Sequence, residues 1–200
     1  DTIRAARGDA SLVGGSEAAI TPLSIAGFCA LKAMSTRNDE YETAMRPFQA
    51  SRDGFVMGEG GAMFVFEELE HAKKRGARIY CEVLGFGSTD DAFHITAPDP
   101  EAKMAREAMR LAIVDARRDS SEVNYINAHG TSTPLNDVME QSAASQLLGA
   151  TAESVMMSST KSQVGHLLGA SGAVELAATA LVIREGVVPA TINQIDPDPE

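Results

Sequence analysis

The sequence predicts an α/β protein, and three observations support this prediction. Short apolar runs, several of which end in glycine or polar residues, alternate with longer segments of helical periodicity. Proline follows a capping threonine at Thr21-Pro22 and precedes another helical segment at Pro100. The 200 residues are 44% hydrophobic and 22% charged, which is an ordinary globular composition with enough chain for a substantial core.

The elements of the first part follow in chain order. Residues 10–15 (ASLVGG) have the apolar run and paired glycines of a buried strand. A helix is expected from Pro22 to Met34, with apolar residues at helical spacing, and the polar residues 35–54 are expected to form a long surface loop. Residues 60–67 (GGAMFVFE) predict a second strand, and a short charged helix is expected to pass through residues 73–75.

The second part repeats the alternation. Residues 79–87 predict a strand, and a helix with an apolar stripe is expected between Pro100 and Ala116. Short strands are expected at 123–128 and 155–158, with a helix over 135–148 between them. The last helix, 169–184, is apolar almost all round and is therefore expected to be buried.

Composition narrows the classes of function. A formal net charge of −11 argues against nucleic-acid binding, because phosphate contacts need concentrated Lys and Arg. No apolar run reaches the length of about 18 residues that predicts a membrane span. Two cysteines, both in apolar runs, give neither a disulfide framework nor a metal cluster, so a cytoplasmic location is expected. The first and last residues, Asp1 and Glu200, suggest a piece of a longer protein.

Two of the four histidines stand in settings that favour chemistry. His129 lies in NAHGTSTP directly after a predicted strand, and His166 lies in SSTKSQVGH between a strand and the last helix. Ligands bind at strand ends in α/β sheets, and the small flanking residues allow close approach. Lys161 stands at the same strand end, and Glu175 is its expected partner, because an unpaired buried carboxylate is costly.

Other chemistries fit less well. The two histidines lack the ligand spacing of a zinc site, so no metal is expected. The GFGSTD run lacks the third glycine of a dinucleotide fingerprint, and no phosphate-binding Gly-Lys-Ser/Thr or nucleophile elbow occurs. Asp53 and Glu59 are expected to cap or shape loops, although a catalytic role stays open.

Taken together, the motifs resemble those of the β-ketoacyl-[acyl-carrier-protein] synthases, in particular the type II elongating condensing enzymes of fatty acid synthesis (synthase II) in the thiolase superfamily. The resemblance extends over nearly the whole chain, and its most specific segments are NAHGTSTP and TK with GHLLG. It implies a thiolase-like fold of layers α-β-α-β-α, of which this chain would hold the end of the first half with its long loop (residues 1–75) and most of the second half (residues 76–200).

The resemblance also implies a reaction. An acyl group passes from acyl carrier protein to a cysteine, malonyl-carrier protein is decarboxylated, and the carbanion joins the acyl group, which lengthens a fatty acid by two carbons. No cofactor is implied, because phosphopantetheine of the carrier protein holds the substrates, and a homodimer is expected. Polyketide ketosynthases share these motifs, so that pathway stays open.

The resemblance assigns roles residue by residue. His129 and His166 match the paired oxyanion donors, Lys161 matches the motif lysine, and Glu175 matches its glutamate partner. Three further positions match substrate-binding residues, Thr131 and Thr133 along the pantetheine arm and Phe28 in the acyl pocket, although Phe28 could equally be a core residue. Lys32 falls near a basic position that meets the acidic carrier protein.

Two features of the family are absent from the sequence. The nucleophilic cysteine is expected just upstream of the segment that matches Asp1, and neither Cys29 nor Cys81 matches it. The glycine-rich loop near the C-terminus of the family is also missing, so this chain alone is expected to be inactive. Two alternatives remain: a non-catalytic ketosynthase-like partner subunit, and a thiolase, whose Cys-His-Cys set fits the NAHGT motif poorly.

Overall fold

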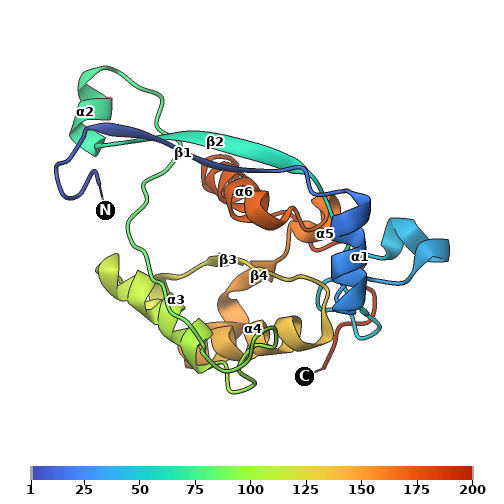
Figure 1. The fold of residues 1–200 in the computed structure, drawn as a ribbon. Coiled ribbons are helices and arrows are strands. Elements are labelled where there is room, and N and C mark those ends of the chain that lie inside the picture. The colour runs from blue at the N-terminus through green and yellow to red at the C-terminus, as the bar shows by residue number, and fades with distance from the viewer. Residues whose placement is uncertain (1, 200) are drawn as a thin grey trace.

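The computed structural model describes residues 2–199, in which two small sheets and their helices are stacked in layers. Strands β1 (Ala10–Glu17) and β2 (Gly60–Glu67) form an antiparallel pair, and β3 (Tyr125–Asn127) and β4 (Met156–Ser158) form a parallel pair. From one side to the other, the layers are β1–β2, helix α6 (Ser171–Glu185), β3–β4, and then helices α3 (Lys103–Asp115) and α4 (Pro134–Leu148) (Figure 1). These are four successive layers of the expected α-β-α-β-α stack.

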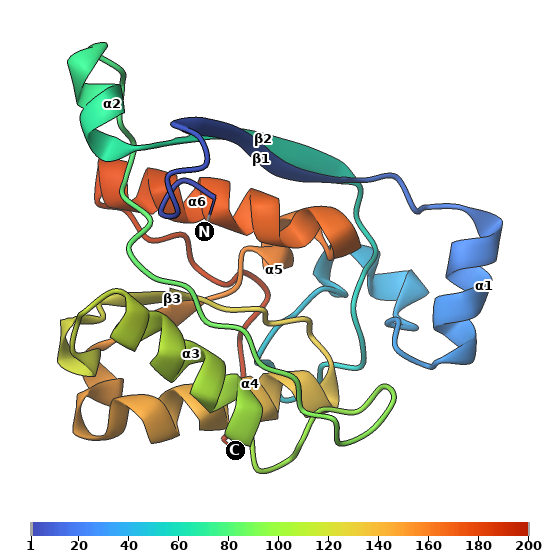
Figure 2. The same cartoon turned by 60° about the vertical axis from the view of Figure 1, so that its left-hand side comes forward.

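The remaining elements are short helices: α1 (Pro22–Ala30), α2 (Leu69–Lys74), α5 (Lys161–Val164), and the 3₁₀ turns η1 (Asn38–Thr43), η2 (Ser120–Glu122), η3 (Gly149–Ser154) and η4 (Leu168–Ala170). Figure 2 shows α1 at one end of the β1–β2 sheet and α2 at the other. None of the helices within residues 2–199 combines the length and the apolar character needed to cross a membrane.

The first half of the chain fits the predicted order but differs in two places. The expected helix 22–34 ends at Ala30, because Lys32 adopts a left-handed backbone (φ 54°). The Lys32 and Ala33 amides then donate to the carbonyls of Cys29 and Phe28, as in a Schellman termination. A glycine normally marks this motif, so a lysine there gave no signal in the sequence.

The expected surface loop 35–54 is only partly on the surface. Its second part is buried, and Arg52 is 7% exposed because its guanidinium donates to the carbonyls of Gln49, Thr133 and Pro134. Phe55 and Met57, which follow this loop, form the apolar core cluster with Met45. The loop is therefore packed against the N-terminal end of α4 rather than exposed on the surface.

Residues 79–87 do not form the predicted strand. The segment instead lies across α3, so closely that a β-carbon on Gly85 or Gly87 would come within 2.1 or 2.0 Å of the carbonyls of Ala112 and Ala108. A strand requires a neighbouring strand to satisfy its backbone, and the described residues place a helix there instead. The Phe86 amide of residues 79–87 donates to the carboxylate of Asp115 in α3.

Helix α6 is not buried all round, as the sequence suggested. One side packs on β1 and β2, and Asn127 of β3 donates to the Glu175 carbonyl on the other side. Leu181 and Ile183, however, are 43% and 61% exposed. Two smaller corrections concern α3, which begins at Lys103 rather than at Pro100, and β3, which has three residues rather than the predicted six.

Candidate active site

His129 follows strand β3, and helix α4 fixes its backbone. The amides of His129 and Gly130 both donate to the Glu140 carboxylate, over 2.5 and 2.7 Å. Gly130 has φ 42° and packs so tightly on Ser159 that a β-carbon would lie 2.4 Å from the Ser159 β-carbon. Glycine is therefore required after the histidine, and the turn presents the imidazole at the end of the strand.

Lys161 contacts both the His129 turn and helix α6. It begins α5, directly after strand β4, and it is 1% exposed. Its ammonium group contacts Nδ1 of His129 at 3.1 Å, donates to the His129 carbonyl at 2.6 Å, and forms an ion pair with Glu175 of α6. The expected Lys161–Glu175 pair is thus present, and all three hydrogens of the ammonium group have acceptors.

His166 is held by the segment that follows Phe55. Its amide donates to the Val56 carbonyl at 2.8 Å, and its carbonyl accepts from the Gly58 amide at 2.9 Å. Its ring nitrogen Nδ1 accepts the Leu168 amide at 3.1 Å. Because a backbone amide can only donate, Nδ1 carries a lone pair and the ring proton lies on Nε2.

The two imidazoles are neighbours. Their ring centroids are 5.2 Å apart with an interplanar angle of 88°. Phe55 contacts the His166 ring edge-on at 5.2 Å, and Phe28 contacts Phe55 at 5.3 Å. Phe28 therefore belongs to an aromatic row that ends at His166, and it also packs against the core cluster, so the core setting is present and the role in an acyl pocket stays a prediction.

Both histidines are neutral near pH 7. The pKa of His129 is lowered to about 3 and that of His166 to about 4, from an ordinary value of 6.5. Loss of hydration among the surrounding protein atoms is the largest cause for both rings, although His129 keeps part of its surface open to solvent. The positive charge of Lys161 is the second cause.

The pKa values of the carboxyl groups in the site are shifted upward, in the opposite direction to those of the histidines. Burial raises the pKa of Glu140 and of Glu175, and the nearby Lys161 charge opposes the rise at both. Hydrogen bonds from the His129 and Gly130 amides also oppose it at Glu140.

The other candidate residues lie in the turn before α4, at the end of α1 and in the loops that hold Asp53 and Glu59. Thr131 is 5% exposed, and its hydroxyl lies 2.9 Å from that of Thr133, which precedes α4. Lys32 is exposed at the end of α1. As expected, Asp53 and Glu59 shape loops: Asp53 accepts from Ser35 and Thr36, and Glu59 accepts the Ile20 amide.

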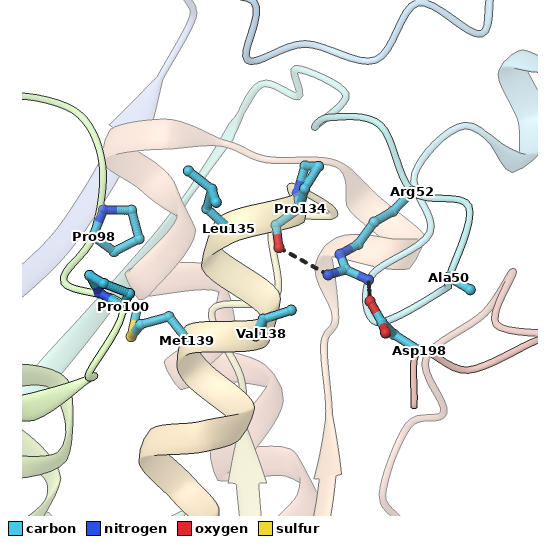
Figure 3. A pocket seen from close by; sticks show the side chains of 9 residues that line it. All are labelled: Ala50, Arg52, Pro98, Pro100, Pro134, Leu135, Val138, Met139 and Asp198. Carbon is cyan, nitrogen blue, oxygen red and sulfur yellow. Dashed lines mark hydrogen bonds and ion pairs between the residues drawn. The ribbon is translucent and has the colours of Figure 1, made fainter. Parts of the chain in front are cut away.

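A pocket of about 390 Å³ lies beside the N-terminal half of α4. Figure 3 shows Leu135 and Met139 facing Pro98 and Pro100 on one side, and Arg52 contacting Asp198 on the other. Neither histidine lines this pocket, so it adjoins the threonine turn rather than the imidazole pair. Its walls are mainly apolar, and Arg52 and Asp198 are the charged residues that line it.

Sequence reasoning missed three residues that build the site. Glu140 holds the His129 turn, and the buried Asp137 accepts the Phe48 amide at 2.9 Å and lies 3.5 Å from Arg52. Asp137 and Glu140 are three residues apart on a helix that directly follows the histidine motif, so their shared face could have drawn attention to them. The burial of Arg52 had no local signal.

The comparisons with known proteins agree with this geometry. The chain matches the family described as beta-ketoacyl synthase, N-terminal domain, over residues 1–72, and beta-ketoacyl synthase, C-terminal domain, over residues 80–194. It is 52% identical over 192 residues to 3-oxoacyl-[acyl-carrier-protein] synthase 2 of Staphylococcus aureus, covering 96% of this chain and 46% of that protein. The chain thus spans about half the length of the curated relatives that it matches.

Solved structures agree in fold. A type II PKS ketosynthase in complex with its acyl-carrier protein, bound to the hexaketide, superimposes with a TM-score of 0.97 at 42% identity, over 99% of this chain and 49% of that chain. A beta-ketoacyl synthase from Burkholderia phymatum superimposes with a TM-score of 0.93 at 43% identity, over 99% of this chain and 47% of that chain. With both domain families matched in order, and with His129 after β3 and His166 after α5 brought side by side, this chain belongs to the beta-ketoacyl synthase family and has its thiolase-like fold.

Proposed function

We propose that the protein containing this chain is a 3-oxoacyl-[acyl-carrier-protein] synthase, which joins an enzyme-bound acyl group to malonyl-acyl carrier protein and lengthens fatty acids by two carbons. The observation that carries this proposal is the protonation state of the two imidazoles, in which each ring is neutral and its Nε2 holds the hydrogen. Lys161 and the Leu168 amide occupy the two Nδ1 atoms, so both rings present a neutral Nε2–H donor.

Two such donors suit decarboxylation of a malonyl thioester. When the bond to the carboxylate breaks, carbon dioxide leaves and the electron pair moves to the thioester enolate, whose oxygen gains negative charge. Neutral N–H donors at fixed positions stabilise that oxygen without reorganisation. The enolate carbon then attacks the acyl carbonyl, and the cysteine thiolate leaves.

The acyl-carrying cysteine is proposed to lie in another part of the protein. Cys29 is exposed on α1, and burial raises the pKa of the Cys81 thiol, which is the opposite of an activated thiolate. These observations also support a second candidate, a ketosynthase-like subunit that lacks its own nucleophile and packs against an active partner.

Roles at the edges of the site follow from the same proposal. Thr131 and Thr133 hydrogen-bond the pantetheine arm, Phe28 lines the acyl pocket, and the exposed Lys32 attracts the acidic carrier protein. The substrates arrive on the carrier protein's phosphopantetheine, and the protein needs no other cofactor. A homodimer in the cytoplasm is the expected assembly, to be checked by light scattering of the full-length protein and by cell fractionation.

Release of carbon dioxide from malonyl-carrier protein by the full-length protein tests the proposal. The wild type is expected to release it, and His129→Ala and His166→Ala are each expected to lose most of this activity. A wild type that binds malonyl-carrier protein without releasing carbon dioxide supports the non-catalytic subunit instead. The chain lengths of the condensation products distinguish fatty acid from polyketide synthesis.

A further inference from the structure

Ser171, the first residue of α6, makes a contact that neither the motifs nor the family match assigns. Its hydroxyl oxygen lies 2.9 Å from Nδ1 of His166, and Ser171 is 5% exposed. The same nitrogen already accepts the Leu168 amide at 3.1 Å. Since that amide cannot accept, Nδ1 carries its lone pair, and the serine hydroxyl must donate to it.

The backbone contacts of His166 leave its ring orientation undetermined. Bonds to Val56 and Gly58 fix the position of the His166 backbone, and the edge contact with Phe55 limits where the ring can lie. Neither contact distinguishes the two flipped orientations of the ring, because a half-turn about the Cβ–Cγ bond exchanges Nδ1 with Cδ2 and Nε2 with Cε1 in nearly the same volume. The two donors at Nδ1 make this distinction, and Ser171 is the side-chain donor of the two.

We propose that Ser171 is a positioning residue for His166, whose hydroxyl holds the ring with Nδ1 toward α6 and Nε2–H available to the substrate oxygen. This inference rests on the proposed function for its effect on rate. The contact itself, and the ring orientation that it holds, do not depend on the reaction.

The experiment compares Ser171→Ala with the wild type in the full-length protein, using malonyl-carrier protein as substrate. The kcat for release of carbon dioxide is expected to fall about fivefold, the effect of losing one hydrogen bond of ordinary strength, while KM stays unchanged. Ser171→Thr, which keeps the hydroxyl, is expected to restore most of the rate. Ser145→Ala, at an exposed position on α4, is the matched control and is expected to leave kcat unchanged.

A mutant cycle separates positioning from a general structural role. In the His166→Ala background, Ser171→Ala is expected to cause no further loss of the residual rate. An equal loss in both backgrounds would show that Ser171 acts through folding alone and would overturn the proposal. If Ser171→Thr fails to fold, Ser171→Cys, with its weaker donor, is expected to give an intermediate kcat, and a rate no higher than that of Ser171→Ala would count against the proposal.

A spectroscopic readout keeps this inference distinct from the proposed function. With ¹⁵N-labelled histidine, the wild type is expected to show His166 protonated on Nε2, and Ser171→Ala is expected to keep that proton, because the Leu168 amide remains, but to show the Nδ1 signal shifted toward that of a nitrogen with one hydrogen bond fewer. If the wild type does not decarboxylate malonyl-carrier protein, the proposed function fails, whereas the shift of the Nδ1 signal would still uphold the role of Ser171. Identical His166 signals in the two proteins would refute that role.

Discussion

The ammonium group of Lys161 lies 3.1 Å from Nδ1 of His129, so a buried lysine decides which nitrogen of that imidazole carries the proton. An ammonium group has no lone pair to offer, so Nδ1 must accept and Nε2 must hold the hydrogen. The ion pair with Glu175 compensates the charge of Lys161. One side chain therefore links helix α5, helix α6 and the His129 turn.

Removing Lys161 should destabilise the protein more than removing the whole ion pair. Lys161→Met leaves the largely buried Glu175 without its partner, and the free energy of unfolding is expected to fall by about 3 kcal/mol. The double variant Lys161→Met/Glu175→Leu is expected to lose less, because no uncompensated charge remains. Urea unfolding of the full-length protein measures both. A double variant less stable than the single variant would contradict this account.

The neutral histidines should make stability depend on pH in a defined window. In the unfolded chain His129 and His166 take up protons below about pH 6.5, whereas in the folded protein their pKa values are about 3 and about 4. The unfolded state therefore binds more protons between pH 6.5 and 4, and the free energy of unfolding is expected to fall as the pH drops through this window.

Urea unfolding at intervals from pH 7 to pH 4.5 measures that dependence. His166→Gln removes one of the two groups, so its free energy of unfolding is expected to change less steeply with pH than that of the wild type. Because the same carboxylates titrate in both proteins, the difference in slope isolates the histidine. Equal slopes would mean that His166 is protonated in the folded protein near its ordinary pKa.

Glu140 is expected to be needed for the position of His129. Glu140→Ala removes the acceptor of two backbone amides, and the free energy of unfolding is expected to fall by about 1–3 kcal/mol, with a parallel loss of malonyl decarboxylation. Glu153→Ala, at an exposed site, is the control and should change stability by less than about 0.5 kcal/mol. Unchanged decarboxylation in Glu140→Ala would exclude a role in positioning.

The turn after His129 is expected to tolerate no side chain. Gly130→Ala combines a positive φ of 42° with a clash against Ser159, so a loss of about 2 kcal/mol or more in the free energy of unfolding is expected. Gly172→Ala in α6 meets open space and should be neutral or stabilising by up to about 1 kcal/mol. Thermal and urea unfolding of the pair test this contrast, and similar effects of the two substitutions would refute it.

Lys32 is expected to affect the binding of the carrier protein rather than the rate of the decarboxylation step. Lys32→Glu should raise KM for malonyl-carrier protein about fivefold at low salt and leave KM for malonyl-pantetheine unchanged, because the pantetheine arm brings neither phosphates nor protein carboxylates for Lys32 to attract. Lys74→Glu, at an exposed position on α2, makes the same change of charge elsewhere. A similar rise in KM for Lys74→Glu would indicate a general charge effect and no contact at Lys32.

Much of the secondary structure was predictable from local pattern. Strands 10–17 and 60–67 begin at the predicted residues, and the helix after NAHGTSTP has nearly its predicted bounds, because proline and glycine mark their ends. The termination at Lys32 was not predictable, since a lysine rarely adopts the left-handed backbone that closes α1. The predicted boundary between residues 75 and 76 stays a prediction.

The sequence by itself determined the residue types of the site and the chain order of His129, Lys161 and His166, because strand ends and small flanking residues are local features. Only the tertiary structure decided that Glu140 holds the His129 turn, that Lys161 meets His129, and that α6 meets His166. It also decided that residues 79–87 rest on α3. These outcomes depend on which elements become neighbours, and residues tens of positions apart come together only when the layers pack.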